Sequence, residues 1–579
     1  MHFLQKYLKK YGKPFSLAVL FLTCEAVCDL LLPTLMSKII DVGVAEQRMD
    51  YVLKMGGVMI GITAAAAVIS LSRNVIASTV SQRFGTELRS DLFRKIQTFS
   101  FDNVDQFDRA SLVTRLTNDV TQVQNFSNGL MRIFVKAPLL CIGGLIMATR
   151  LNPQLSVVLA VVVPVVGVLI VLNMKVGFPR FLNVQKALDK LNSIMREYLS
   201  GVRVVKAFNR FDFEVEKFDR TNREYQSRSV QAMRAMAFFN PGIILTVNLG
   251  IVAVVWYGGH RVMQGHMQVG HIIAFINYMT QILFSLMMIS MVFNMFIRAR
   301  ASAGRIGEVL MQESGGQPHE SGSRQDAEPG PANGSIAFEN VSFSYEGTVG
   351  EPVLKNVTFS CLPGETVGII GSTGSGKSTL VSLIPRFYNI SSGRLLVGGV
   401  DVSGVDPKRL RSRIAIVPQK TVLFTGTVTD NVRWGKEDAT PEEIETAAKI
   451  AEAHEYISSF PEKYDTRLGQ GGVNFSGGQK QRLSIARAIV RKPDILILDD
   501  CTSAVDVATE ARIKESLKTY AKDLTCLIIA QRITSVMDAD KIVVLDRGEV
   551  VGIGPHDSLV ENCRVYKEIF QSQIGKEMR

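Results

Sequence analysis

The stretch Gly371-Ser372-Thr373-Gly374-Ser375-Gly376-Lys377-Ser378-Thr379 decides the fold of the C-terminal part of the chain. A strand-like run, 366–370, precedes it, and an apolar run, 380–384, follows it. The order strand, G-x-x-x-x-G-K-[ST], helix is the context that a phosphate-binding loop requires. Its glycines let backbone N–H groups approach phosphate oxygens, while Lys377 can reach the β and γ phosphates and Ser378 can ligate Mg²⁺. We therefore predict that this part of the chain binds a nucleoside triphosphate.

Length and composition divide the chain into two regions. A chain of 579 residues is too long for one hydrophobic core, so we expect at least two domains. The mean hydropathy is +0.16 although 21% of the residues are charged, because long uncharged runs are concentrated between residues 15 and 300. The net charge of +11 comes without a basic block, which argues against nucleic acid as a partner. The seven cysteines contain no C-x-x-C pair, which argues against a zinc site.

The apolar runs predict a multi-pass membrane protein. A bilayer crossing needs about 20 mostly apolar residues. Six runs qualify, and we place them near 15–37, 52–78, 128–149, 154–174, 237–258 and 270–297. An even number of spans puts both termini on one side, and a domain that binds nucleotide requires that side to be the cytoplasm. Lys and Arg are concentrated in the inner segments, but these segments are long, so the positive-inside rule supports the orientation only weakly. We therefore expect a protein of the cytoplasmic (inner) cell membrane.

The segments between the spans also carry helical signals. The two long inner connections have apolar periodicity, which predicts that the spans continue as helices beyond the membrane. We expect short turns to join these helices near 101–112 and 207–218. The basic, amphipathic stretch Met1–Lys13 is typical of a helix that lies on the membrane, and no cleavable signal precedes the first span. We thus predict a transmembrane domain over 1–312, a linker rich in Gly, Pro and Ser over 313–334, and an α/β domain over 335–579.

A second motif in the α/β domain is Ile495-Leu496-Ile497-Leu498-Asp499-Asp500, an apolar run that ends in two carboxylates. A fully buried parallel strand has this pattern, and ligands bind beyond the carboxyl ends of such strands. Asp499 is placed to hold the water shell of Mg²⁺. A helix cap would also place acids after a strand, but the neighbouring phosphate loop favours the metal site.

The third motif, Asn474-Phe475-Ser476-Gly477-Gly478-Gln479-Lys480-Gln481-Arg482, resembles the signature sequence of ABC transporters, and the order of all the motifs fits that superfamily. The resemblance covers essentially the whole chain and implies an exporter half-transporter. Its expected fold is an α-helical six-span transmembrane domain followed by an α/β P-loop ATPase domain, the ABC nucleotide-binding domain. ATP and Mg²⁺ are the implied cofactors, and the lipid bilayer is the implied surrounding.

The resemblance also implies roles for individual residues. Tyr345 resembles the aromatic residue that stacks on adenine, Gln419 resembles the glutamine that senses Mg²⁺ and the γ phosphate, and Ser503–Asp506 resembles the D-loop. The implied nucleotide-binding residues are Tyr345, Gly371, Ser372, Thr373, Gly374, Ser375, Gly376, Lys377, Ser378, Thr379, Gln419, Ser476, Gly477, Gly478, Gln479 and Asp506. The implied metal-binding residues are Ser378, Gln419 and Asp499.

A half-length chain of this family implies a dimer. In the family, two ATPase domains pack head to tail, and each ATP lies between the phosphate loop of one chain and the signature of the other. The residue types agree with such an arrangement, since Ser476 and the N–H groups of Gly477 and Gly478 would form an anion cradle at a helix N-terminus.

Two positions depart from the family pattern. The family places a Glu after the Walker B Asp as catalytic base, whereas this chain has Asp500, whose carboxylate sits about 1.5 Å further back. A base must lie within about 3 Å of the proton that it accepts, so the shorter side chain costs rate. The family also has a switch His, whereas this chain has Gln531, which cannot become a cation. Phe475, in place of the usual Leu, is a mild change in an otherwise intact signature.

These departures lead to a hypothesis about the partner. The chain's own site, with Asp499, Asp500 and Gln531 as its catalytic residues, is expected to bind ATP and hydrolyse it poorly. The intact signature would complete a competent site on a second half-transporter that has the consensus Glu and His. This resembles the degenerate-site subunit of heterodimeric bacterial multidrug exporters, which move amphipathic drugs or lipids outward. A homodimeric lipid or peptide flippase and a regulatory, ATP-gated subunit without drug export are the alternatives.

Candidate substrate contacts lie in the spans. Glu25 and Asp29 are four residues apart in the first span and so share one helical face. Ionisable groups at membrane depth are functional candidates, although pairing with Arg or Lys of neighbouring helices is the alternative. Spans 5 and 6 combine Asn with Met and Phe, which suits adaptable apolar binding but is equally typical of membrane-helix packing.

Overall fold

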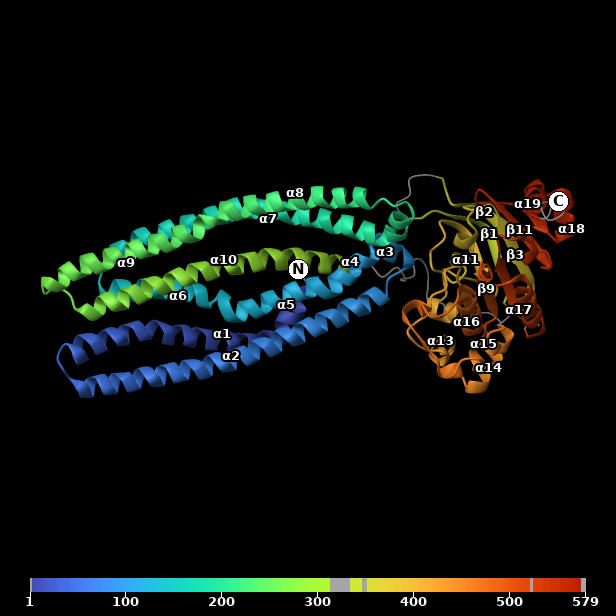
Figure 1. The fold of residues 1–579 in the computed structure, drawn as a ribbon. Helices are drawn as coiled ribbons and strands as arrows, with labels where there is room; N and C mark the ends of the chain where they lie inside the picture. Colours follow the sequence, from blue (N-terminus) through green and yellow to red (C-terminus); the bar gives the residue numbers. More distant parts are fainter. Residues whose placement is uncertain (1–2, 313–333, 346–350, 521–523, 574–579) are drawn as a thin grey trace. The chain divides into compact units, whose positions relative to one another are not determined.

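The computed structural model describes residues 3–312, 334–345, 351–520 and 524–573, which form two compact units (Figure 1). The first unit comprises Met1–Gln97 and Arg109–Gln312, and the second comprises Thr98–Asp108 and Glu313–Arg579. The short segment 98–108, predicted as part of the transmembrane domain, therefore packs with the second unit. The predicted linker, apart from Gly334, lies outside the described residues.

The first unit is entirely helical. Its elements are α1 (Phe3–Lys38), η1 (Ile39–Val44), α2 (Met49–Gln97), α4 (Arg109–Thr114), η2 (Arg115–Asp119), α5 (Val120–Gly129), η3 (Leu130–Phe134), α6 (Lys136–Leu151), α7 (Ser156–Ala207), α8 (Phe211–Ala237), α9 (Phe239–Met263) and α10 (Val269–Met311). They form six helical stretches of 36 to 53 residues, each with an apolar window long enough to cross a membrane, which confirms the six predicted spans. About 20 residues suffice for a crossing, so these helices are longer than a crossing requires.

Two local features differ from the sequence-based expectations. The second inner connection is not a turn over 207–218, because α7 ends at Ala207 and α8 already begins at Phe211. Asp212 and Glu214 lie in the first turn of α8, where negative charge stabilises a helix start. The N-terminal amphipathic stretch is continuous with the first span in α1, which contains Pro14 without ending there. Its position at the membrane surface stays a prediction.

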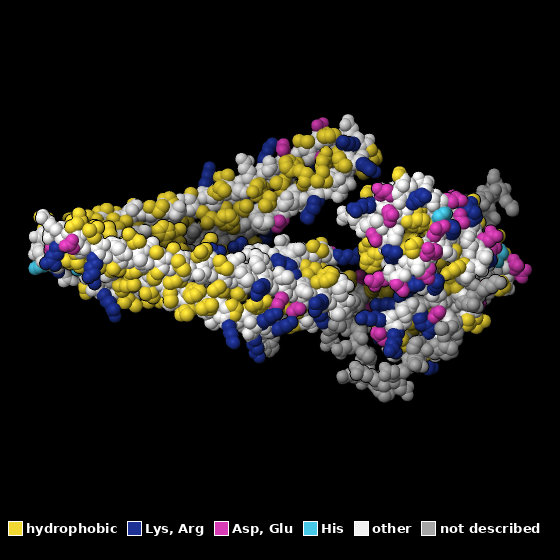
Figure 2. All heavy atoms as spheres, turned by 90° about the horizontal axis from the view of Figure 1, so that it is seen from below, with side chains coloured by type: hydrophobic (Ala, Val, Ile, Leu, Met, Phe, Trp, Pro, Cys, Tyr) yellow, Lys and Arg dark blue, Asp and Glu magenta, His cyan; other side chains and the backbone are white. Residues whose placement is uncertain are grey.

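Apolar side chains cover much of the outer surface of the spans (Figure 2). On α2 and α7 the exposed large residues include Leu53, Ile60, Val68, Leu71, Val157, Val161 and Val168. A surface of this kind is stable in lipid rather than in water. Lipid exposure therefore explains why this unit leaves so many large apolar side chains uncovered.

Polar contacts join α1 to α10 at two levels. In the middle of the helices, the buried Tyr278 hydroxyl donates to the Leu30 carbonyl at 2.7 Å. At one end, the buried Asp41 carboxylate of η1 accepts from the Gly270 N–H at 2.6 Å, in the first turn of α10. A Cβ at position 270 would lie 2.5 Å from the Ser37 carbonyl oxygen, so the close approach requires glycine. Asp41 thus satisfies a free N–H at the start of α10.

The second unit is built on two main β-sheets. One has four antiparallel strands in the order β2-β1-β4-β5, and the other has six strands in the order β12-β11-β3-β10-β9-β6. The central strands β11, β3, β10, β9 and β6 run parallel, and β12 is antiparallel to β11. The strands are β1 (Ile336–Phe343), β2 (Leu354–Cys361), β3 (Thr366–Gly371), β4 (Ser392–Val397), β5 (Val400–Asp401), β6 (Ile414–Val417), β7 (Gly426–Thr427), β8 (Arg467–Leu468), β9 (Ile495–Asp499), β10 (Thr525–Ile529), β11 (Lys541–Asp546) and β12 (Glu549–Gly554).

Helices cover these sheets and form a separate cluster around α16. They are α3 (Phe101–Gln106), α11 (Lys377–Leu383), α12 (Pro407–Ser412), α13 (Val428–Arg433), α14 (Pro441–Ile450), α15 (His454–Ser458), α16 (Gly477–Ile489), α17 (Val507–Tyr520), α18 (His556–Asn562) and α19 (Arg564–Gln573). Short 3-10 turns are η4 (Lys463–Asp465), η5 (Gln470–Gly472) and η6 (Ile533–Ser535). The unit is therefore α/β, as predicted. The carboxyl ends of the parallel strands β3, β6, β9 and β10 meet at one edge, and this edge carries the predicted site residues.

Candidate ATP site

The predicted phosphate loop connects β3 to α11. The chain leaves β3 at Gly371 and enters α11 at Lys377, with Gly376 as the N-cap residue at φ +97°. Gly374 has φ +83°, so two positions of the loop lie in the left-handed region that favours glycine. A Cβ at position 371 would lie 2.0 Å from the Leu545 carbonyl oxygen of β11. The loop therefore has the strand–loop–helix geometry that its sequence predicts.

Lys377 is held inside this loop. Its ammonium donates to the carbonyl oxygens of Gly371 and Ser372, both at 2.8 Å. Desolvation by burial lowers the pKa of Lys377, because few solvent molecules stabilise its charge. Backbone carbonyl groups of the loop thus hold the Lys377 ammonium at a place where the phosphates of a nucleotide would neutralise its charge.

Asp499 ends the buried strand β9 next to the phosphate loop. The Ser378 hydroxyl, in the first turn of α11, donates to its carboxylate at 3.1 Å. Burial is the largest cause that raises the pKa of Asp499, and the charge of Asp500 raises it further. A buried carboxylate beside a hydroxyl oxygen is a donor set that suits Mg²⁺, and the cation would offset the desolvation of the charge. These residues therefore fit the metal that the motif implies.

Asp500 joins two side chains from neighbouring strand ends. Its carboxylate accepts from Nε2 of Gln531, which follows β10, at 2.9 Å, and from Nε2 of Gln419, which follows β6, at 3.1 Å. Asp500 has φ +46°, and its N–H donates to the Ile529 carbonyl at 2.8 Å, which fixes its backbone. The structure thus brings Asp499, Asp500, Gln419 and Gln531 to the edge of the sheet that also carries the phosphate loop.

Tyr345 lies at the rim of the same loop. Its hydroxyl is 2.9 Å from the Thr379 hydroxyl of α11. Its ring contacts the ring of Tyr388 edge to face, with 5.2 Å between the centroids. Tyr388 was not a sequence-based candidate, because a lone tyrosine after α11 carries no motif.

The signature residues form a separate cluster at the start of α16. Ser476 is the N-cap residue and makes a capping box with Gln479, whose Oε1 accepts from the Ser476 N–H at 2.9 Å. Gly477 and Gly478 lie in the first turn, where their N–H groups are available to an anion. Among the described residues, no hydrogen bond joins Ser476–Gln479 to the phosphate loop of the same chain. The chain therefore presents its two predicted phosphate-binding features as separate surfaces.

The D-loop is tied to the signature helix rather than to the phosphate loop. The Gln481 side chain donates to the Ser503 hydroxyl at 3.2 Å and accepts from the Ala504 N–H at 3.0 Å. Gln481 lies within the signature sequence, but nothing in the spacing of the motif predicts that it anchors the D-loop. Asp506 caps α17, where its carboxylate accepts from the Thr509 N–H at 2.9 Å.

The segment between α2 and α4 docks on the second unit through α3. The Phe101 ring lies 4.5 Å from the Phe387 ring, measured between centroids. The Tyr388 hydroxyl donates to the Asp105 carboxylate at 2.8 Å. A covalent extension of the spans thus contacts the domain that carries the phosphate loop. The sequence predicted a turn near 101–112, whereas the structure has α3 and the start of α4 there, and no sequence pattern indicated the contacts of α3.

The acids of the first span pair with basic residues of neighbouring helices. Lys136 of α6 lies 2.7 Å from Glu25 and 2.8 Å from Asp29, measured to the carboxylate oxygens. Arg73 of α2 lies 3.0 Å from the other Glu25 oxygen, in an ionic contact that is not aligned as a hydrogen bond. Glu25 and Asp29 are therefore paired with basic residues of neighbouring helices, which was the alternative to a role in substrate binding.

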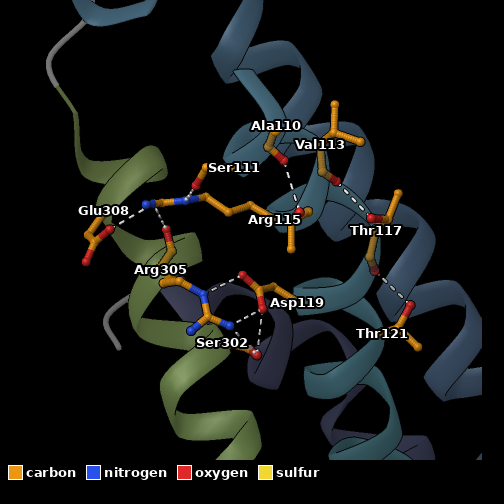
Figure 3. Close-up of polar contacts among 11 residues, drawn as sticks. Ala110, Ser111, Val113, Arg115, Thr117, Asp119, Thr121, Ser302, Arg305 and Glu308 are labelled. Atoms are coloured by element: carbon orange, nitrogen blue, oxygen red, sulfur yellow. Dashed lines mark hydrogen bonds and ion pairs between the residues drawn. The ribbon is translucent and has the colours of Figure 1, made fainter. Parts of the chain in front are cut away.

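A second polar cluster ties the end of α10 to η2 (Figure 3). The buried Asp119 carboxylate accepts from the Ser302 hydroxyl and from Nε of Arg305, both at 2.8 Å. One turn away, Arg115 donates to the Glu308 carboxylate at 2.8 Å and to the Arg305 carbonyl. These contacts fix the last turns of the sixth span, just before the chain continues toward the second unit.

Comparison with known proteins agrees with this architecture. Residues 15–287 match the ABC transporter transmembrane region, and residues 354–503 match the ABC transporter domain. The chain is 42% identical to the ABC transporter ATP-binding protein YfiB of Bacillus subtilis, over 99% of this chain and 98% of that protein. It is 32% identical to YgaD of Bacillus subtilis, named as a multidrug export ATP-binding/permease protein, over 98% of each chain. A bacterial Atm1-family ABC exporter, solved with ATP bound, shares the fold with a TM-score of 0.78 and 23% identity, over 97% of this chain and 98% of that chain.

Six spans followed by an ATPase domain with a phosphate loop and a signature define an ABC exporter half-transporter. The chain belongs to the ABC transporter family. It is a multi-pass membrane protein whose ATPase domain uses ATP with Mg²⁺ and is coupled to transport. Exporters of this family work as dimers in a lipid bilayer.

Proposed function

We propose that this chain is the degenerate-site subunit of a heterodimeric exporter that moves amphipathic drugs or lipids out across the cytoplasmic membrane. Both termini and the ATPase domain would lie in the cytoplasm. The observation that carries the proposal is the pair of amide hydrogen bonds on the Asp500 carboxylate, from Gln419 and Gln531.

A catalytic base must take a proton from the attacking water. Asp500 is one methylene shorter than the Glu of the family pattern, so it reaches less far toward the γ phosphate. Two amide donors, from Gln419 and Gln531, already occupy one of its carboxylate oxygens. A positioned general base contributes about 10²–10⁴-fold to a rate. The shorter reach, together with the engagement of one carboxylate oxygen by two amides, would therefore leave ATP bound and slowly hydrolysed.

Binding of ATP itself requires none of the changed residues. The phosphate loop, from Gly371 to Thr379, and Lys377 within it would hold the phosphates, and Tyr345 would stack on the base. Ser378, Gln419 and Asp499 would hold Mg²⁺ and its water shell, and the metal would neutralise charge on the β and γ phosphates. The site is thus suited to long occupancy by ATP.

The signature would act on the partner's nucleotide. Ser476, Gly477, Gly478 and Gln479 keep the family residues, and their capping box fixes the start of α16, with Gly477 and Gly478 in its first turn. Asp506, at the start of α17, would lie near the same interface. The partner would supply the Glu and His that this chain lacks, so that one of the two composite sites hydrolyses ATP at a full rate.

An amphipathic substrate agrees with a cavity among the spans. The cavity has a volume of about 900 Å³ and lies between α7, the end of α8 and α10. Apolar side chains such as Phe178, Met236 and Phe293 line it, and its polar lining residues are Asn173, Lys175, Ser290 and Asn294. Phe275, also in α10, does not line the cavity and is fully buried. The mixture of aromatic, Met and Asn side chains suits substrates with an apolar body and a few polar groups.

ATPase activity tests the proposal. The purified chain alone is expected to show little turnover, and the chain with its partner is expected to show turnover that drugs stimulate. Asp500→Glu combined with Gln531→His should raise the turnover of the pair, because the second site then gains a base and a switch residue. Robust turnover of the chain alone would instead support the homodimeric flippase. No rise in the double variant would contradict the degenerate-site account.

A regulatory subunit is the second candidate, because a site that holds ATP without hydrolysing it can gate a conformation. Its distinguishing outcome is ATP-dependent closure of the pair without drug movement into inverted membrane vesicles. Drug accumulation in such vesicles would favour the exporter.

A further inference from the structure

The helix α19, near the C-terminus, packs against the segment that carries Gln531. Tyr566 of α19 is fully buried and belongs to one apolar cluster with Ala530 and Ile533, which lie on either side of Gln531 in the sequence. Phe570, one turn further along α19, packs on the same cluster. The apolar face of α19 is therefore docked beside the backbone that follows β10, and this docking brings the end of the helix close to that backbone.

Gln573, the last residue of α19, makes two hydrogen bonds with this backbone. Its Oε1 accepts from the Ile533 N–H at 2.7 Å, and its Nε2 donates to the Gln531 carbonyl at 2.8 Å. Arg532, between them, has extended backbone angles, with φ −96° and ψ 133°. In extended backbone the carbonyl before a residue and the N–H after it point the same way, so one primary amide can bond both. Gln573 thus satisfies a donor and an acceptor of a segment that has left the sheet.

These two bonds act on the backbone from which the Gln531 side chain starts. On one side of Gln531, the Ala530 N–H donates to the Ile369 carbonyl of β3 at 3.2 Å, and on the other side the 3-10 turn η6 follows. The Gln531 side chain itself donates to Asp500 at 2.9 Å. A backbone that is bonded at residue 531 restricts the places that this side chain can reach. Gln573 therefore determines, through the backbone, where the Gln531 amide lies.

The Gln531 amide lies on the side of the site where a γ phosphate would be bound. Its acceptor Asp500 directly follows Asp499, whose carboxylate is bonded to Ser378 of the phosphate loop. A metal ion held at Asp499 and Ser378 would bridge the β and γ phosphates. An amide N–H next to this place can donate to a γ-phosphate oxygen, and a nucleoside diphosphate offers no such oxygen.

We propose that Gln573 is a positioning residue of the ATP site, which holds the Gln531 amide where it can donate to the γ phosphate. This inference deepens the proposed function and rests on its placement of ATP at the phosphate loop of this chain. It gives α19 a part in a site whose sequence motifs end at Gln531. The role of Gln573 is to favour a nucleoside triphosphate over a diphosphate, and it does not depend on how fast the site hydrolyses ATP.

The γ phosphate provides the readout. AMP-PNP resists hydrolysis and has a γ-phosphate group, whereas ADP has none. Without the bonds from Gln573, the Gln531 amide would no longer meet the γ phosphate in one fixed position. Loss of a hydrogen bond to a charged group is expected to weaken AMP-PNP by about tenfold. The phosphate loop and Tyr345 share no hydrogen bond with Gln573 among the described residues, so the affinity for ADP should change by less than about twofold.

Photolabelling of the full-length chain with its partner, in lipid nanodiscs, tests the proposal. The probe is 8-azido-ATP, and a tag on this chain separates its label from the label of the partner. Unlabelled AMP-PNP or ADP, each with Mg²⁺, is titrated against the probe. In Gln573→Ala, the concentration of AMP-PNP that halves the label should rise by about tenfold, and that of ADP should stay within about twofold.

Two further variants separate the hydrogen bonds from the packing of α19. Gln573→Met keeps the length of the side chain and lacks its amide, so it should give the same selective loss as Gln573→Ala. Gln571→Ala is the matched control, because it removes an exposed side chain of the same type from the same helix. This control should behave like the unmodified chain with both nucleotides.

The outcomes distinguish this inference from the proposed function. Unchanged protection by AMP-PNP in both Gln573 variants, or an equal loss for AMP-PNP and ADP, would overturn the role of Gln573 and leave the degenerate-site proposal intact. A selective loss for AMP-PNP in a chain that turns over ATP robustly on its own would support Gln573 and contradict the degenerate site. If neither nucleotide reduces the label of the unmodified chain, the site does not bind nucleotide, and both proposals fail.

Discussion

Nε2 of Gln531 lies 2.9 Å from Oδ2 of Asp500, so the two residues that depart from the family pattern are direct hydrogen-bond partners. Gln419 donates to the same oxygen. The departures from the family pattern at positions 500 and 531 therefore meet in one hydrogen bond rather than at two separate places in the site. A histidine at position 531 would bring a group that can carry positive charge, whereas the amide of Gln531 is a neutral donor at every pH.

Removal of the Asp500 carboxylate tests whether this site hydrolyses ATP. Asp500→Asn keeps the size of the side chain and removes its ability to accept a proton. In the complex with the partner, we expect turnover to fall by less than about twofold, because the site lacks the base contribution of about 10²–10⁴-fold from the start. The matching Glu→Gln change in the partner should abolish most turnover and serves as the control. A loss of about 100-fold in Asp500→Asn would identify Asp500 as a working base.

Asp499 is expected to determine the metal dependence of ATP binding. Asp499→Asn removes the charge that Ser378 orients and that Mg²⁺ would neutralise. Loss of a group that holds the water ligands of a metal typically costs about 10–100-fold in metal affinity. Titration of a fluorescent ATP analogue at several Mg²⁺ concentrations should show that loss, while binding in EDTA stays near the unmodified value. The control Ser382→Ala removes a hydroxyl one turn further along α11, which bonds the Ser378 carbonyl and, among the described residues, has no hydrogen bond to Asp499. An unchanged Mg²⁺ dependence in Asp499→Asn would place the metal on other ligands.

Motifs predicted the nucleotide edge of the second unit because each motif residue sits directly at a strand end. Gly371 and Asp499 end β3 and β9, Gln531 follows β10 closely, and parallel strands bring such ends together without further information. The contact between Tyr388 and Asp105 joins residues 283 positions apart, and neither belongs to a repeating pattern. Such a pair depends on tertiary packing, which no local pattern indicates.

In the membrane unit, too, local sequence patterns predicted the helices but not the contacts between them. Apolar length predicted all six spans, because lipid exposure imposes composition on every residue of a crossing. The partners of Glu25 were not predictable, since Lys136 comes from a helix 111 positions away. The sequence predicted a turn over 207–218, whereas α8 begins at Phe211. The signal for this start is the pair of acidic residues in its first turn, Asp212 and Glu214, which apolar periodicity does not register.

Glu25 is expected to stabilise the spans rather than to bind substrate. Its side chain is 10% exposed and contacts both Arg73 and Lys136, whereas that of Asp29 is 31% exposed and contacts Lys136. Glu25→Gln leaves a buried positive charge without its partner, which typically costs about 3–5 kcal/mol. Thermal unfolding in detergent should show a large loss for Glu25→Gln and a smaller loss for Asp29→Asn. A folded, stable Glu25→Gln variant with a raised KM for one class of drug would instead indicate a substrate contact.

Asp119 is expected to couple the end of the sixth span to η2. Asp119→Asn removes the charge that Arg305 contacts while it keeps an oxygen for the Ser302 hydroxyl (Figure 3). Loss of hydrogen bonds to a charged group typically costs about 1.5–3 kcal/mol, so the last turns of α10 should loosen. We expect basal ATP turnover to persist. Drug stimulation of turnover should fall, because a loosened end of α10 transmits less of its movement to the spans. Glu308→Gln is the matched control, since the Glu308 side chain is largely exposed and Arg115 keeps its bond to the Arg305 carbonyl. Equal drug stimulation in Asp119→Asn and in the unmodified complex would show that the cluster only supports the fold.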